Sequence, residues 1–74
     1  MNKELQIGSI YQHYKNKKQY KVIGIGKHTE TLEDLVIYEP QYESETKYWI
    51  RPLAMFMDEV EYEGAKTPRF IFVR

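Results

Sequence analysis

The sequence contains no cysteine, which excludes disulfide bonds and thiolate-bound zinc as sources of stability in a chain of only 74 residues. A chain of this length is expected to form one domain, and it buries only about 60% of the surface that its unfolded form exposes. Stability must then come largely from aromatic packing, for which the chain has seven tyrosines, three phenylalanines and one tryptophan. We predict one small β domain over residues 1–74, with residues 1–8 as a loose lead-in.

Long apolar runs are also absent. No uninterrupted apolar segment approaches the roughly 20 residues that a transmembrane helix needs. The first eight residues lack the apolar stretch that is typical of a signal peptide. The absence of cysteine fits a reducing compartment. We therefore expect a cytoplasmic protein that makes no membrane contact.

The chain has no overall excess of either charge, but its charges are unevenly distributed. Residues 1–28 carry six lysines and one glutamate, a net charge of +5. Residues 29–63 carry ten acids against two bases, and residues 64–74 carry three bases, net charges of −8 and +3. A protein dedicated to binding phosphate backbones usually has a clear positive excess. The lysines at positions 15, 17, 18 and 21 leave room for a local basic patch, although such a run more often forms a solvated turn.

Sequence signatures of catalysis are missing as well. There is no Gly-x-Ser-x-Gly motif, and the two glycines at positions 24 and 26 do not make a phosphate-binding loop. His13, His28, Glu30 and Glu33 are residue types that bind zinc or iron, but no pair of them has the close spacing of a metal motif. We therefore predict neither a metal nor a cofactor.

Short runs of alternating apolar residues, separated by turn signals, predict strands rather than helices. The predicted strands are residues 10–15, 19–27, 35–39, 47–51, 59–62 and 69–73, and one short helical or 3₁₀ turn is expected over residues 53–57. Gly24 and Gly26 alternate within the second strand, on the expected face of Tyr20 and Val22 and opposite Ile25. Glycines at such positions indicate the curvature that closes a small barrel. The predicted fold is mainly β, a closed SH3-like barrel of about five strands.

Two segments carry a resemblance to a known family. They are the loop His28-Thr29-Glu30-Thr31-Leu32-Glu33 and the segment Trp49-Ile50-Arg51-Pro52 followed by Met55-Phe56. With the flanking strands, they resemble the small bacterial family catalogued as domain of unknown function 1653, over about residues 8–70. The resemblance implies a compact SH3-like barrel and no established activity.

The His28–Glu33 loop supplies the first group of candidate site residues: His28, Thr29, Glu30 and Glu33. It is long for a hairpin connection, and a histidine beside carboxylates suits acid–base chemistry near neutral pH. The structural interpretation is that a threonine caps one helical turn while Leu32 packs into the core. The sequence leaves both interpretations open.

The second group of candidates is Trp49, Arg51, Tyr11 and His13. Trp49 and Arg51 alternate onto one strand face, and both residue types are enriched in binding hot spots. The simpler interpretation of Trp49 is that it is the largest core side chain. We expect Arg51 to pair with Glu30 or Glu33, because a partly buried arginine favours a carboxylate.

These patterns support two main hypotheses for function. The first is a non-catalytic binding module for a peptide, a nucleic acid or a small ligand, held near His28, Glu30, Trp49 and Arg51. The alternative is a small hydrolase-type enzyme in which His28 and Glu30 or Glu33 act as acid and base, with or without a metal. A purely structural domain, monomeric or weakly dimeric, is the third. The sequence does not identify a partner, and both protein and nucleic acid fit.

Overall fold

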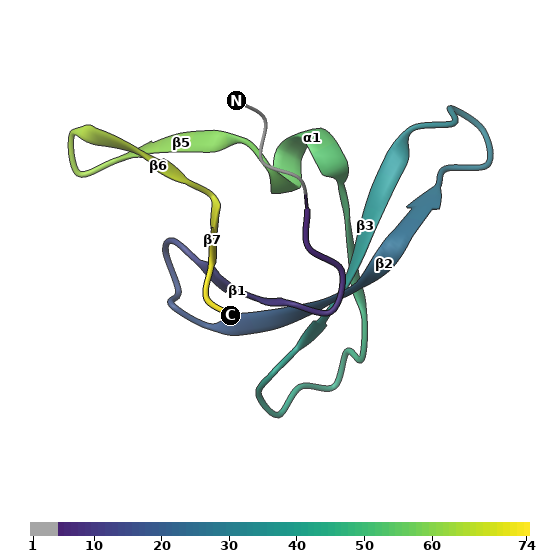
Figure 1. Ribbon diagram of the computed structural model, residues 1–74, viewed down its shortest axis with the longest axis horizontal. Helices are drawn as coiled ribbons and strands as arrows, with labels where there is room; N and C mark the ends of the chain where they lie inside the picture. Colours follow the sequence, from purple (N-terminus) through teal and green to yellow (C-terminus); the bar gives the residue numbers. More distant parts are fainter. Residues whose placement is uncertain (1–4) are drawn as a thin grey trace.

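The computed structural model describes residues 5–74, which form seven strands and one short helix (Figure 1). Six of the strands and the helical turn match ranges predicted from the sequence. The seventh, β6, was not predicted because its residues show no apolar alternation. The elements are β1 (Ile10–His13), β2 (Gln19–Lys27), β3 (Asp34–Pro40), β4 (Trp49–Pro52), α1 (Leu53–Phe56), β5 (Glu59–Tyr62), β6 (Ala65–Pro68) and β7 (Phe70–Phe72).

The strands form one antiparallel sheet in the order β4-β3-β2-β1-β7, and β5 and β6 form a separate hairpin (Figure 1). The mainly β prediction is confirmed, but the predicted closed barrel is not found. Within residues 5–74, β4 and β7 are the two edges of the large sheet and no strand pairs across them. The stack of Phe56 on Phe70 connects the edge strand β7 to α1, which directly follows the other edge strand, β4.

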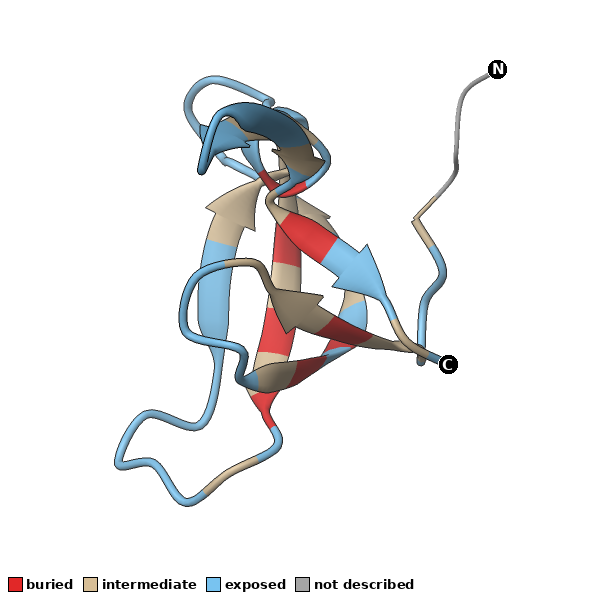
Figure 2. Ribbon diagram, turned by 90° about the vertical axis from the view of Figure 1, so that its left-hand side faces the viewer, coloured by how far each residue is buried: buried red, intermediate tan, exposed pale blue. Residues whose placement is uncertain are grey.

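The core is a cluster of aromatic rings with two valines. Figure 2 marks the buried positions in red, most of them along the strands of the large sheet. Phe56 of α1 is fully buried and stacks on Phe70 of β7, with ring centroids 4.0 Å apart and an interplanar angle of 5°. The edges of Tyr11 and Tyr38 meet the Phe56 ring at 5.5 and 5.3 Å. The buried residues of this core cluster are Tyr11, Tyr20, Val22, Val36, Tyr38, Phe56 and Phe70.

A β-bulge in β2 changes which of its residues face the core. The register with β3 shifts between Val22 and Gly24, so that Gly24 pairs with Ile37 and Ile25 pairs with Val36. Paired residues of an antiparallel sheet share a face, and Val36 is fully buried. The predicted strict alternation is therefore wrong beyond the bulge, because the extra residue moves Ile25 to the inner face and Gly24 to the outer one. The bulge also increases the twist of the strand.

The segment before β1 is held by contacts where the structure describes it. Leu5 packs against the core, and the Gly8 amide donates to the Val22 carbonyl at 2.8 Å. The first four residues of the predicted lead-in lie outside the described residues. No helix within residues 5–74 is both long and apolar enough to cross a membrane.

Replacing Phe56 tests the central role of the ring stack. We expect Phe56→Ala to lower the free energy of unfolding by about 3–5 kcal/mol, because it leaves a cavity at the fully buried centre of the cluster. Urea unfolding followed by fluorescence measures the change. Met55→Ala on the exposed side of α1 is the matched control and should change stability by about 0.5 kcal/mol or less. Equal effects of the two substitutions would contradict the assignment, and Phe56→Leu serves if the alanine variant does not fold.

Candidate functional site

The inner side of the sheet holds a small cavity, which we call the aromatic hollow. Its volume is about 160 Å³. It brings together three residues that the sequence singled out: His13 from β1, and Trp49 and Arg51 from β4. The other lining residues complete it from β2, β3, β7 and the turn between β1 and β2. The full set is His13, Asn16, Tyr20, Tyr38, Trp49, Arg51 and Phe70.

The register of β3 with β4 places the two β4 residues. Tyr38 pairs with Trp49, and Val36 pairs with Arg51, so these four side chains share the inner face of the sheet. Trp49 nevertheless stays 44% exposed, because Phe56 and Phe70 already fill the core. The interpretation of Trp49 as the largest core side chain is therefore wrong, and its ring forms an exposed part of the hollow.

Arg51 is the cation of the hollow. Its Nε donates a hydrogen bond to the Tyr38 hydroxyl at 3.3 Å, and its guanidinium carbon lies 5.6 Å from the centroid of the Phe70 ring. The predicted pairing with Glu30 or Glu33 is wrong, since no carboxylate in the described part of the chain forms an ion pair with Arg51. Glu30 and Glu33 lie in the loop between β2 and β3. Arg51 pairs with Val36, further along β3 from this loop than the last pair of the β3–β4 ladder, Leu35 with Pro52.

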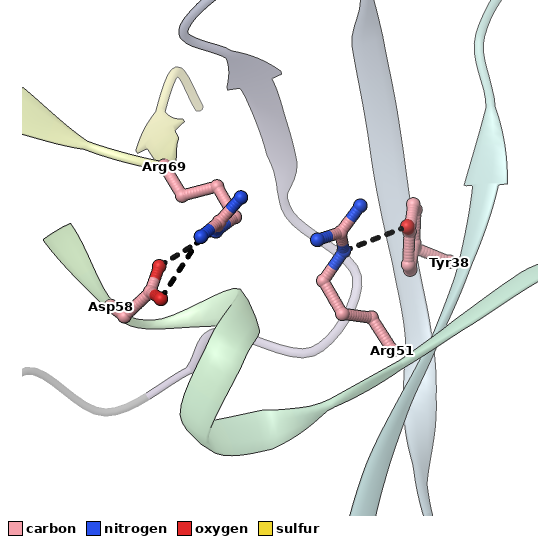
Figure 3. A network of polar contacts seen from close by, with 4 residues as sticks. All are labelled: Tyr38, Arg51, Asp58 and Arg69. Atoms are coloured by element: carbon pink, nitrogen blue, oxygen red, sulfur yellow. Dashed lines mark hydrogen bonds and ion pairs between the residues drawn. The ribbon is translucent and has the colours of Figure 1, made fainter. Parts of the chain in front are cut away.

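Arg69, by contrast, is paired. Its Nε and Nη2 donate to the two carboxylate oxygens of Asp58 at 2.7 and 3.1 Å (Figure 3). The hydrogen bond from Arg69 to Asp58 raises the pKa of the guanidinium above its ordinary value. Figure 3 shows the Arg51 and Arg69 side chains extending toward the same space, only one of them neutralised by a carboxylate.

His13 contributes an imidazole whose neutral form is favoured by its surroundings. Its Nδ1 accepts hydrogen bonds from the backbone amides of Lys15 and Asn16 at 3.2 and 3.5 Å. Burial lowers the pKa of the imidazole, and the positive charges of Arg51, Arg69 and Lys15 lower it further. Because Nδ1 is an acceptor, the neutral ring carries its proton on Nε2. The edge of this ring meets Phe70 with centroids 5.1 Å apart.

Tyr20, which lines the hollow, is held by side-chain hydrogen bonds. The Tyr20 and Tyr42 hydroxyls are 3.1 Å apart, and the Asn16 side-chain amide donates to the Tyr20 hydroxyl at 3.4 Å. Burial raises the pKa of Tyr20 above its ordinary value, so the phenol stays protonated. The Lys18 ammonium lies 4.5 Å from the centroid of the Tyr42 ring. A positive charge therefore lies over the tyrosine that is hydrogen-bonded to Tyr20.

The His28–Glu33 loop is a turn stabilised by its own histidine. Nδ1 of His28 accepts from the amides of Glu30 and Thr31 at 3.0 and 3.3 Å, and the Leu32 amide donates to the His28 carbonyl at 2.8 Å. The expected packing of Leu32 into the core is wrong: Leu32 is 66% exposed and has a φ of 62°. A threonine does accept a backbone hydrogen bond, from the Glu33 amide to Thr31 Oγ1 at 3.2 Å.

The same turn occurs between β1 and β2, over residues 13–18. The Lys17 amide donates to the His13 carbonyl, and Lys17 has a φ of 63°, as Leu32 has in the other turn. Asn16 occupies the position equivalent to Thr31, and its Oδ1 accepts a hydrogen bond from the Lys18 amide at 2.7 Å. Both histidines therefore act first as local acceptors that hold a hairpin turn. Only His13 also lines the aromatic hollow.

Comparison with known proteins agrees with the architecture. A family model described as "Protein of unknown function (DUF1653)" matches residues 9–72. The chain belongs to the DUF1653 family. A crystal structure of a DUF1653 protein from Bordetella bronchiseptica is similar, with 28% sequence identity and a TM-score of 0.83, over 95% of this chain and 88% of that one. No curated protein matches this chain.

In this DUF1653 chain the remaining sequence-predicted candidates lie outside the hollow. Tyr11 is in the core, and its hydroxyl accepts from the Gln6 amide at 3.1 Å. Thr29 and Glu30 are exposed in the β2–β3 turn. Glu33 borders a larger, more open and mostly apolar depression of about 670 Å³, shared with Leu5, Ile25, Asp34, Leu53, Ala54 and Met57. Over residues 5–74, no three histidine or acidic side chains are grouped to hold a metal ion.

Sequence reasoning missed four residues of the hollow. Tyr20 shares a strand face with buried Val22, which was visible as alternation, but its place beside His13 follows from the β1–β2 register. Tyr38 and Phe70 line the hollow because their strands pair with segments far apart in the sequence. No local sequence pattern specifies such pairings. Asn16 lies in the turn between β1 and β2, and a polar turn residue carries no sequence signal for a cavity.

The lowered pKa of His13 predicts a pH dependence of stability. The neutral ring is favoured by folding, so this contribution is present above the ordinary pKa of 6.5 and is lost as the pH falls through the folded pKa. We expect the free energy of unfolding of the wild type to fall below about pH 6.5 more steeply than that of His13→Asn, which keeps an acceptor but does not titrate. Urea unfolding from about pH 5 to 8 measures the difference. An imidazole NMR titration midpoint at or above 6.5 would contradict it.

Proposed function

We propose that this chain is a non-catalytic binding module whose ligand occupies the aromatic hollow. The observation that carries the proposal is Arg51: a half-buried guanidinium inside an aromatic cavity, with no carboxylate partner in the described part of the chain. A partly desolvated charge is costly unless it is paired, and such groups concentrate at binding sites. The rigid rings around it supply contact area at little cost in conformational entropy.

The exposure of Trp49 supports the same proposal. A large ring that is 44% exposed at the border of a cavity is a typical anchor for a bound group. Its neighbour on β4, Ile50, pairs with Ile37 on the opposite face and does not line the hollow. The strand therefore presents its two binding-prone residue types, Trp49 and Arg51, on the inner side only.

The catalytic alternative loses its sequence support. It rested on His28 acting with Glu30 or Glu33, yet Nδ1 of His28 accepts two backbone hydrogen bonds inside the turn. Neither glutamate side chain forms a hydrogen bond or ion pair with His28 among the contacts within residues 5–74. The histidine and the carboxylates are neighbours in sequence without forming an acid–base pair, which favours binding over catalysis.

A fragment screen tests the proposed binding role. We expect some members of a mixed set of neutral, anionic and cationic fragments to shift backbone amide NMR signals of the residues that line the hollow. Trp49→Ala should weaken these fragments by about tenfold, since an aromatic anchor contributes on the order of 1–2 kcal/mol. Ile50→Ala is the matched control, because Ile50 is also an exposed apolar residue of β4 but lies on the other face. Shifts confined to other surfaces, or an absence of shifts, would overturn the proposal.

A further inference from the structure

We propose that the aromatic hollow is an oxyanion site, which receives a carboxylate or phosphate group of its ligand against the Arg51 guanidinium. This inference rests on the proposed binding function and adds the chemical class of the ligand. It follows from three features of the described residues: the polar groups that line the hollow, the charges that surround it, and its size.

The polar groups of the hollow are mainly hydrogen-bond donors. Arg51 uses Nε on the Tyr38 hydroxyl, and no hydrogen bond within residues 5–74 engages its terminal nitrogens. The Nε2 proton of His13 and the indole N–H of Trp49 are likewise without a hydrogen-bond acceptor in that part of the chain. Among residues 5–74, no carboxylate lines the cavity. A ligand that satisfies these donors must bring acceptor oxygens, and a guanidinium binds the two oxygens of a carboxylate or phosphate through parallel hydrogen bonds.

The surrounding charges favour an anion as well. Both carboxylate oxygens of Asp58 are engaged by Arg69. Arg69 extends toward the same space as Arg51 (Figure 3), and Lys18 lies over the ring of Tyr42 next to Tyr20. Asp58 neutralises Arg69, whereas no carboxylate within residues 5–74 pairs with Arg51. An anion beside the Arg51 guanidinium is attracted by a charge that the described residues leave unpaired.

The same charges argue against the other ligand that aromatic cavities commonly take. Clusters of tyrosine, tryptophan and phenylalanine often bind methylated ammonium groups through their ring faces. Here Arg51 already lies over Phe70 and repels a second cation. The cavity of about 160 Å³ is also smaller than the roughly 300 Å³ or more of a pocket for a whole drug-sized molecule. It fits one functional group, while the remainder of the ligand lies outside, within reach of Trp49.

Anion titrations of the intact chain test the inference. Sodium phosphate, sodium acetate, acetamide and tetramethylammonium chloride are titrated separately at constant ionic strength while backbone amide and Arg51 Nε–H NMR signals are recorded. We expect saturable shifts at the hollow with phosphate or acetate, and none with acetamide or tetramethylammonium. Comparing the two anions identifies the preferred source of the oxyanion. Arg51→Gln should weaken anion binding at least about tenfold, because it removes a charged partner.

Two further variants separate the guanidinium from general positive charge. Arg51→Lys keeps the charge but loses the paired donors, and we expect affinity between those of the wild type and Arg51→Gln. Lys66→Gln removes one exposed charge from β6, outside the hollow, and should leave affinity within about twofold. Equal losses in Arg51→Gln and Lys66→Gln would overturn the oxyanion site. If fragments bind the hollow but both anions fail, the inference falls and the binding function stands; if neither binds, both fall.

Discussion

The stack of Phe56 on Phe70 joins parts of the chain that strand pairing leaves apart. Phe56 comes from α1 and Phe70 from the edge strand β7, and their rings are parallel with centroids 4.0 Å apart. Asp58 and Arg69, which flank these segments, reinforce the contact with two side-chain hydrogen bonds and a backbone bond from the Arg69 amide to the Asp58 carbonyl at 3.0 Å. A 74-residue chain without disulfides depends on such a contact, because so little surface is available for burial.

The aromatic hollow is a consequence of that stack. With Phe56 parallel to one face of Phe70, the rest of the Phe70 ring is left to the edges of His13 and Tyr20 and to the Arg51 guanidinium. The ring that completes the core is therefore also a wall of the candidate site. The site is positioned by sheet pairing and ring packing rather than by a long loop, which gives the precision that a binding group requires.

The strands could be predicted because their signals are local, whereas the site depended on contacts that are not. Turn residues and alternation predicted β2 within the correct bounds, but the bulge after Val22 exchanged the faces of Gly24 and Ile25. Such a bulge is set by the partner strand. The size of Trp49 predicts a core position, yet the core is occupied by Phe56 of α1. The sequence does not specify the direction of α1, and so it does not predict which ring enters the core.

The two histidine turns show how a distinctive motif can mislead about function. The sequence His28-Thr29-Glu30-Thr31-Leu32-Glu33 invited an acid–base interpretation, whereas His13-Tyr14-Lys15-Asn16-Lys17-Lys18 looked like an ordinary polar turn. The structure gives both the same backbone and the same imidazole acceptor, so the motif records turn chemistry. The two histidines differ in their surroundings. His28 is exposed to solvent, whereas His13 lines a cavity together with Arg51, which has no ion-pair partner among the described residues. A half-buried cation without a carboxylate partner among the described residues is a stronger indicator of function than an unusual sequence motif.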